Sequence, residues 1–80
     1  MAYPTALEIT AKDRGGLVVD IAGVLAAAKL RVLSLSVRGT GANQAVAKLM
    51  VEVQDLDQLL SVMTKLHQIS GVSSVQRATS

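Results

Sequence analysis

The hydrophobic pattern of this chain changes its period in a fixed order, and this order constrains the fold more than any other feature. Residues 5–11 alternate between apolar and polar side chains, as in a strand with one buried face. From Leu17 the apolar residues recur at helical spacing, which predicts a helix from about Gly16 to Lys29. Residues 31–38 alternate again. The first half of the chain is therefore predicted to be strand, helix, strand.

The second half repeats the order after a hairpin. Residues 39–43 hold two glycines and an asparagine, which predicts a hairpin loop slightly longer than the two-residue minimum. Residues 44–53 alternate as a strand. Asp55, with Gln58 three residues later, is a capping-box pattern that predicts the start of a second helix. A glycine that suits a left-handed stop then opens a shorter strand, 71–78, which we expect at a sheet edge.

Each element has a face that we expect to be buried. In the two middle strands these faces include Leu33, Leu35 and Val37, with Ser34, Ser36 and Arg38 turned outward, and then the alternate residues from Ala45 to Val53. In the helices they are two apolar stripes: Leu17, Ile21, Val24, Leu25 and Ala28, and then Leu56, Leu59, Leu60, Met63 and Leu66.

This order predicts a ferredoxin-like α+β sandwich. Right-handed crossovers place the four strands in one antiparallel sheet with both helices on one face. No linker or low-complexity segment interrupts residues 1–80, so we expect a single domain. A chain of 80 residues buries only about 60% of its unfolded surface, which leaves a lone monomer little stability to spare.

Composition excludes several classes of site. The chain has no cysteine and a single histidine, so we expect no disulfide, no thiolate metal site and no metal cluster. A net charge of +2, with the basic residues scattered, gives no argument for nucleic acid. No apolar run reaches the ~20 residues that a bilayer span needs, and no secretion signal opens the chain. We expect a cytoplasmic domain.

The residue pattern also argues against catalysis. No two carboxylates are placed as an acid–base pair, and no serine has a nucleophile-elbow context. His67 falls in the last turn of the second predicted helix, where a cation suits the helix dipole. None of the predicted strands carries an aromatic side chain on which RNA bases would stack. We therefore expect no catalytic residues and no cofactor.

The loop Asp13-Arg14-Gly15-Gly16 has two readings. The glycines can simply reverse the chain between strand and helix, since glycine accepts positive φ at little cost. Alternatively, they expose the first amides of the helix, whose positive end attracts a carboxylate or phosphate. Arg14 then adds a charge-assisted contact or is a solvated loop residue. Asp13 caps the helix or binds an amino group.

The chain resembles an ACT domain, and most closely the carboxy-terminal ACT domain of the long RelA/SpoT-type GTP pyrophosphokinases. The resemblance runs from about Leu7 to Ala78. It is carried by four segments taken together: Asp13-Arg14-x-Gly16-Leu17, Asp20-Ile21, Val51-Glu52-Val53-x-Asp55-Leu56 and Ile69-x-Gly71-Val72-x-x-Val75-x-Arg77.

The resemblance implies a ligand site at the first loop. Ligands of the family are usually small molecules, often amino acids, held between this loop and a partner protomer. The matching candidates are Asp13, Arg14, Gly16 and Leu17, with Gly15 as a neighbour. The subfamily often places an asparagine where the first helix gives way to the second strand. This chain has Lys29-Leu30-Arg31 there, so no ligand role is carried over to that junction.

The resemblance also implies a homodimer that pairs through the first helix and the second strand. The outer face of that helix is small and almost uncharged, which would let two helices approach closely; the other reading is that it reflects a high alanine content. The strand 31–38 would be an open sheet edge. The expected interface residues are Val19, Gly23, Ala26, Ala27, Val32, Ser34 and Ser36.

The function implied is regulatory: a domain of a larger (p)ppGpp synthetase/hydrolase that senses an amino acid at a dimer interface. The alternative is a module that contacts other macromolecules, since carboxy-terminal regions of the resembled enzymes contact the ribosome. Phosphate contacts would then come from Arg31, Arg38, Lys48 and Arg77, which a solvated strand surface explains equally well.

Overall fold

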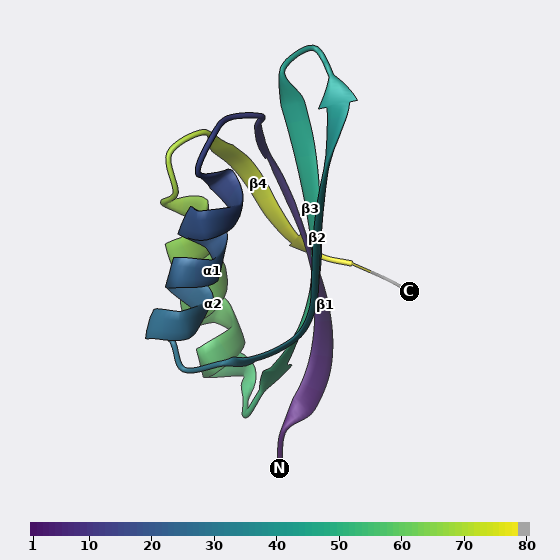
Figure 1. Cartoon of the computed structure of the whole chain (residues 1–80). Helices are drawn as coiled ribbons and strands as arrows, with labels where there is room; N and C mark the ends of the chain where they lie inside the picture. The colour runs from purple at the N-terminus through teal and green to yellow at the C-terminus, as the bar shows by residue number, and fades with distance from the viewer. Residues whose placement is uncertain (79–80) are drawn as a thin grey trace.

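The computed structural model describes residues 1–78 and has the predicted order of elements. The six elements are β1 Tyr3–Lys12, α1 Leu17–Ala27, β2 Arg31–Gly41, β3 Gln44–Val53, α2 Leu56–His67 and β4 Val72–Arg77. The strands form one antiparallel sheet in the order β2-β3-β1-β4, and both helices cover the same face of it (Figure 1). The predicted ferredoxin-like sandwich is confirmed, with β2 and β4 at the two edges.

The core lies between the sheet and the helix layer and is aliphatic. β1 and β3 alternate strictly between buried and more exposed residues, because successive side chains of a strand point to opposite faces. Burial of apolar surface at about 25 cal/mol per Å² makes this layer the main stabilising contact of the domain. The buried apolar residues are Leu7, Ile9, Ala11, Leu17, Ile21, Leu25, Ala45, Ala47, Leu49, Val51, Val53, Leu59, Val62 and Leu66.

A β-bulge in β2 overturns the expected inward position of Leu33. Val32 pairs with Val51 and Ser34 pairs with Met50, so Leu33 is the extra residue between two consecutive partners. Its side chain is 44% exposed. A bulge resets the alternation by one residue. From Leu35 onward the predicted inward and outward faces of β2 hold.

The buried face of α2 is also displaced from the predicted stripe. Leu59, Val62 and Leu66 are buried, whereas Leu56 and Leu60 are 61% and 52% exposed. Residues three or four apart lie on the same face of a helix, so Leu59, Val62 and Leu66 form one buried face. Leu56 and Leu60 lie at the side of that face. The apolar pattern alone does not show which side of a broad stripe meets the sheet.

The hairpin between β2 and β3 is tighter than predicted. β2 continues to Gly41, and only Ala42 and Asn43 form the turn, both with positive φ (53° and 61°). Two left-handed residues in succession are the geometry of a type I′ turn, whose twist matches that of the flanking strands. The expected loop of 39–43 is therefore wrong. Most of it is strand.

Hydrogen bonds define the start of α2 and the end of α1. At α2, Asp55 Oδ1 accepts from the Gln58 amide at 2.8 Å and Gln58 Oε1 accepts from the Gln54 amide at 2.6 Å, so the predicted cap is confirmed. At α1, the Lys29 amide donates to Ala26 O and the Leu30 amide to Leu25 O, which is a Schellman motif. The motif requires a left-handed residue. Lys29 supplies it with φ 58°.

The predicted left-handed glycine is confirmed, but not as the end of the helix. Gly71 has φ 89°, while α2 ends at His67. The Gly71 carbonyl accepts from the Lys12 amide at 2.8 Å. This bond brings the α2–β4 turn against the end of β1, next to the loop that precedes α1.

Candidate functional site

The loop between β1 and α1 consists of Asp13, Arg14, Gly15 and Gly16. Gly16 occupies the N-cap position of α1 in a left-handed conformation, φ 84°, and no side chain caps the helix. The predicted capping role of Asp13 is therefore wrong. Its amide donates to Asn43 O at 2.8 Å, and its carboxylate lies toward the β2–β3 hairpin, where a Cβ on Gly39 would be 3.1 Å from Oδ2.

The Arg14 guanidinium is held in place beside this first turn. Nε donates to Ser70 O at 3.1 Å, Nη1 to Gly15 O at 3.0 Å and Nη2 to Asp20 Oδ2 at 2.6 Å. Three of the five N–H donors of an arginine are thus used. A guanidinium held on three sides is a preorganised donor for a carboxylate.

The predicted loop residues divide into two kinds. Gly15 and Gly16 are exposed and carry no side chain over the first amides of α1. Leu17 is 3% exposed, so its side chain belongs to the core and only its backbone faces the loop. The chemistry of the site is therefore backbone N–H groups plus one guanidinium. Both are donors, and both favour an anion.

Asp20 and Ser70 belong to this site but were not predicted. Asp20 lies in the first turn of α1, and its carboxylate is the ion-pair partner of Arg14. Ser70 contributes its backbone carbonyl from the α2–β4 turn, 56 residues away in sequence. A single sequence gives no sign that residues 56 positions apart are in contact. Because the acceptor is a backbone carbonyl, the residue type at position 70 gives no sign of it either.

The outer surface of α1 is exposed and apolar, as expected, but its small residues are not equivalent. Val19, Gly23 and Ala27 lie four residues apart and line a groove of about 520 Å³ together with Ile69 and other residues of both segments. Ala26, in contrast, does not line this groove. The predicted helix face therefore spans two directions, one toward the α2–β4 turn and one away from it.

The predicted strand residues of the interface also fall on two faces. β2 is an edge strand of 11 residues whose far edge pairs with no other strand of residues 1–78. Ser34 and Ser36 pair with Met50 and Lys48 on the face away from the helices. Val32, before the bulge, pairs with the buried Val51 on the helix side, and it is 40% exposed.

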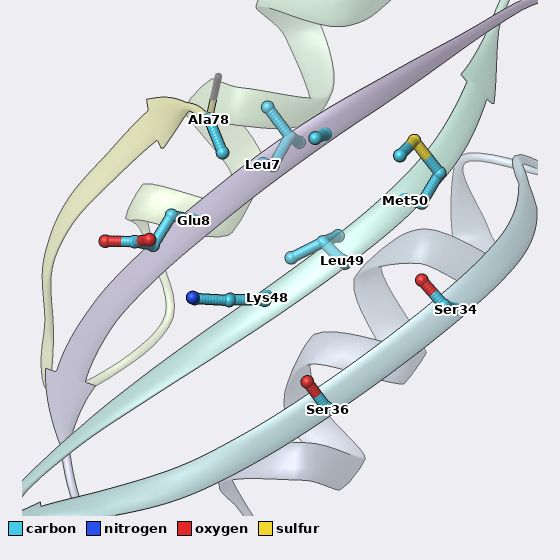
Figure 2. Close-up of a pocket in the computed structure, with 9 residues that line it drawn as sticks. Leu7, Glu8, Ser34, Ser36, Lys48, Leu49, Met50 and Ala78 are labelled. Atoms are coloured by element: carbon cyan, nitrogen blue, oxygen red, sulfur yellow. The ribbon is translucent and has the colours of Figure 1, made fainter. Parts of the chain in front are cut away.

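The face of the sheet opposite the helices carries a shallow hollow of about 300 Å³ (Figure 2). Glu8 on β1 and Lys48 on β3 project from this face, and Ser34 and Ser36 project beside them from β2 (Figure 2). Both helices lie behind the sheet in this view. Further lining residues are Ala6, Leu7, Leu49, Met50 and Ala78.

The four basic residues of the alternative reading do not converge. Lys48 pairs in register with Glu8 and Arg31 with Glu52, so an acid stands opposite each of these two bases. Arg38 on the edge strand β2 stands opposite Val46. Arg77 lies on β4, the opposite edge strand, where it pairs with Leu7. A phosphate site of this kind is built from clustered cations, and neighbouring acids weaken it. This arrangement does not supply one.

Two exclusions can be stated for residues 1–78. No group of three or more histidine, cysteine, aspartate or glutamate side chains is placed to hold a metal ion, and His67 lies in the last turn of α2 as predicted. Neither helix of this part of the chain is long and apolar enough to cross a membrane.

The comparison with protein families decides the identity of this fold. The sequence pattern of the ACT domain matches residues 1–77. The chain belongs to the ACT domain family. This ACT domain is 32% identical over 74 residues to a GTP pyrophosphokinase of Myxococcus xanthus, and 32% identical over 78 residues to the bifunctional (p)ppGpp synthase/hydrolase RelA of Mycobacterium tuberculosis.

The matched relatives are far longer than this ACT domain. The alignments cover 92% and 98% of the chain but only 10% and 11% of the two relatives. Among solved structures, the ACT domain from GTP pyrophosphokinase of Chlorobium tepidum superposes with a TM-score of 0.85 at 23% identity, covering 98% of this chain and all of that one. That likeness concerns the fold.

Proposed function

We propose that this ACT domain is a non-catalytic regulatory module that binds a small carboxylate ligand, an amino acid, at the start of α1. The observation that carries the proposal is the geometry of the first turn. α1 begins at the left-handed Gly16 without any side-chain cap, and the Arg14 guanidinium is fixed beside it. The Leu17 amide donates to Arg14 O at 3.4 Å, but no side chain of residues 1–78 caps the helix, and helix-start amides and a held guanidinium both favour an anion.

The Arg14–Asp20 pair suits a ligand that carries both charges. Arg14 has two N–H donors beyond its three bonds. The Asp20 carboxylate is about half exposed at 49%, so it can accept from an ammonium group while it keeps its bond to Arg14. An α-amino acid carries both a carboxylate and an ammonium group.

We further propose that the domain acts as a homodimer through β2 and the side of α1 next to it. The 11 residues of β2 form a long edge with free N–H and C=O groups, which favours pairing with another strand. Val18 on α1 and Val32 and Leu33 on β2 are exposed apolar side chains on these two elements. A second protomer would cover them and add the buried area that a domain of 80 residues lacks.

The proposed target of regulation is a GTP pyrophosphokinase or (p)ppGpp hydrolase of which this domain is one part. The support is the identity of 32% to such enzymes over nearly the whole domain. Ligand binding stabilises the state that binds it by an amount that grows with ligand concentration. A dimer stabilised in this way can bias catalytic domains on the same polypeptide.

Amide chemical shifts during titration with each of the common amino acids test the ligand. We expect movement at residues 13–20 with at least one amino acid, and none with the matching amine that lacks the carboxylate. Gly16→Ala should weaken binding at least tenfold, because its side chain meets a positive φ and Arg14 Nη1 at 3.4 Å. Gly23→Ala, in the body of α1, is the control, since a Cβ there has nothing within 4 Å.

Absence of any movement at residues 13–20 with every amino acid would contradict the proposal. The alternative module, which would contact ribosomal RNA, is tested in parallel by sedimentation at low salt. The acids opposite Arg31 and Lys48 lead us to expect no salt-sensitive association.

A further inference from the structure

The outer face of the sheet is a second surface, separate from β2's free edge and from the α1 loop. The helices cover only the opposite face, so the outward side chains of β1 and β3 meet no other layer of residues 1–78 (Figure 1). Ala6, Thr10, Val46 and Met50 are nevertheless only partly exposed, because they pack against one another across the strands.

Three consecutive rows across β1 and β3 define this surface. Met50 stands opposite Ala6, Lys48 opposite Glu8 and Val46 opposite Thr10. In two of the three rows the residue on β3 is the complement of the residue on β1: a large side chain faces a small one, and a base faces an acid. In the third row two β-branched side chains of similar shape face each other.

This complementarity fits a second copy of the same face. A two-fold axis parallel to the strands, lying between β1 and β3, places β1 of each copy over β3 of the other. Glu8 then meets the second copy's lysine at position 48, and Met50 enters the hollow above the alanine at position 6. The hollow of about 300 Å³ seen in Figure 2 lies where that methionine would enter.

The size of the face agrees with a dimer of modest strength. Strands of 10, 11, 10 and 6 residues, about 4.8 Å apart with about 3.3 Å per residue, give a face of roughly 600 Å² per copy. Two such faces bury roughly 1,200 Å², the lower end of specific protein interfaces. Sheets that pack face to face cross at about 30°. The two faces are therefore in closer contact at the three central rows than at the outer strands.

We propose that the outer face of the sheet binds the same face of a second copy of this domain, with Glu8 of each copy against Lys48 of the other. This face shares Ser34 and Ser36 with the expected edge interface, but it leaves the backbone edge of β2 and the α1 loop open, so the two kinds of pairing can coexist. Two edge-paired dimers would then join into a tetramer.

Mixing two charge-reversed chains tests this pairing. Glu8→Lys places lysines at both positions 8 and 48, and Lys48→Glu places acids at both. Each variant alone sets like charges against each other and should associate at least tenfold more weakly than the unmodified chain. An equimolar mixture sets only opposite charges against each other between the two chains, although positions 8 and 48 within each chain carry like charges. It should associate more tightly than the unmodified chain, and less so at high salt.

The location is read from amide shifts of isotope-labelled Glu8→Lys chain on addition of unlabelled Lys48→Glu chain. We expect changes at Ala6, Thr10, Val46 and Met50. A mixture that associates no more tightly than the unmodified chain, or changes confined to β2 and α1, would overturn the proposal. Confinement to β2 and α1 would leave the edge-paired dimer intact, so the two outcomes are distinguishable.

Two controls keep the experiment decisive. Asp57→Lys mixed with Lys65→Glu makes the same charge change on the exposed side of α2, and we expect no gain in association there. If a charge reversal impairs folding, Glu8→Gln and Lys48→Gln replace it. Each should then weaken association, and their mixture should recover part of it, because Lys48 of one chain still meets Glu8 of the other.

Discussion

Arg14 and Asp20, six residues apart in the chain, meet at 2.6 Å between Nη2 and Oδ2, and the same guanidinium donates to the Ser70 carbonyl at 3.1 Å. One side chain thus joins three segments: the β1–α1 loop, the first turn of α1 and the α2–β4 turn. The arginine of the proposed ligand site is therefore also a structural link. Its loss should affect stability as well as binding.

Arg14→Ala should lower the free energy of unfolding by about 1–2 kcal/mol, since it removes three hydrogen bonds and leaves the Ser70 and Gly15 carbonyls to water. Asp20→Asn should cost less than about 1 kcal/mol, because the ion pair is partly exposed. Urea denaturation measures both. Arg38→Ala, an exposed arginine on β2, is the control and should change stability by no more than about 0.5 kcal/mol. An Arg14 variant as stable as that control would contradict the linking role of this side chain.

The two loop glycines should respond differently to alanine. Gly16 has φ 84°, where an alanine costs about 1–2 kcal/mol, whereas Gly15 does not have a positive φ and a Cβ added there would have no neighbour within 4 Å. We expect Gly16→Ala to destabilise the domain by about that amount. Gly15→Ala should leave it unchanged or slightly stabilised. Thermal denaturation compares the pair directly, and equal effects would count against the assigned conformations.

Lys29→Gly should stabilise the domain by about 1 kcal/mol. Lys29 is the left-handed residue of the Schellman motif that ends α1, and glycine adopts that conformation without the Cβ penalty. Lys29→Ala removes the charge but keeps the penalty, so it should bring no such gain. If both substitutions raise the midpoint of unfolding equally, the effect comes from the lysine side chain instead.

Ala42→Gly should stabilise the hairpin by about 0.5–1 kcal/mol. Ala42 is the first of the two left-handed turn residues, with φ 53°, and type I′ turns strongly prefer glycine, asparagine or aspartate at these positions. Ser36→Gly, six residues earlier in β2 and paired in register with Lys48, serves as the control and should destabilise the strand, because glycine loses more conformational freedom there. Denaturant midpoints give both values, and a loss of stability in Ala42→Gly would refute the turn type.

The order of elements could be predicted from periodicity because burial imposes different spacings on helices and strands. The capping of α2 could be predicted too, since Asp55 and Gln58 interact within one turn. These features depend on neighbours in sequence. They are set before any long-range contact forms.

The bulge at Leu33 and the exposure of Leu60 could not be predicted in this way. A bulge is a mismatch between two strands, so it depends on how β2 pairs with β3 rather than on β2 alone. Leu60 is apolar and at helical spacing, yet the rotation of α2 over the sheet leaves it outside the core.

The candidate site also has parts that could be predicted from local sequence and parts that depend on long-range contacts. The loop glycines and Arg14 were predicted from residue type and resemblance. The role of Ser70 depends on a turn 56 residues away that the fold brings to the same place.

The solution mass of the domain, with and without a mixture of amino acids, tests the central claim most directly. We predict a dimer or a multiple of it, with a dissociation constant that falls when amino acids are present, because ligand binding favours the paired state. A mass of one chain, 8.3 kDa, at every protein concentration and with every amino acid would contradict it.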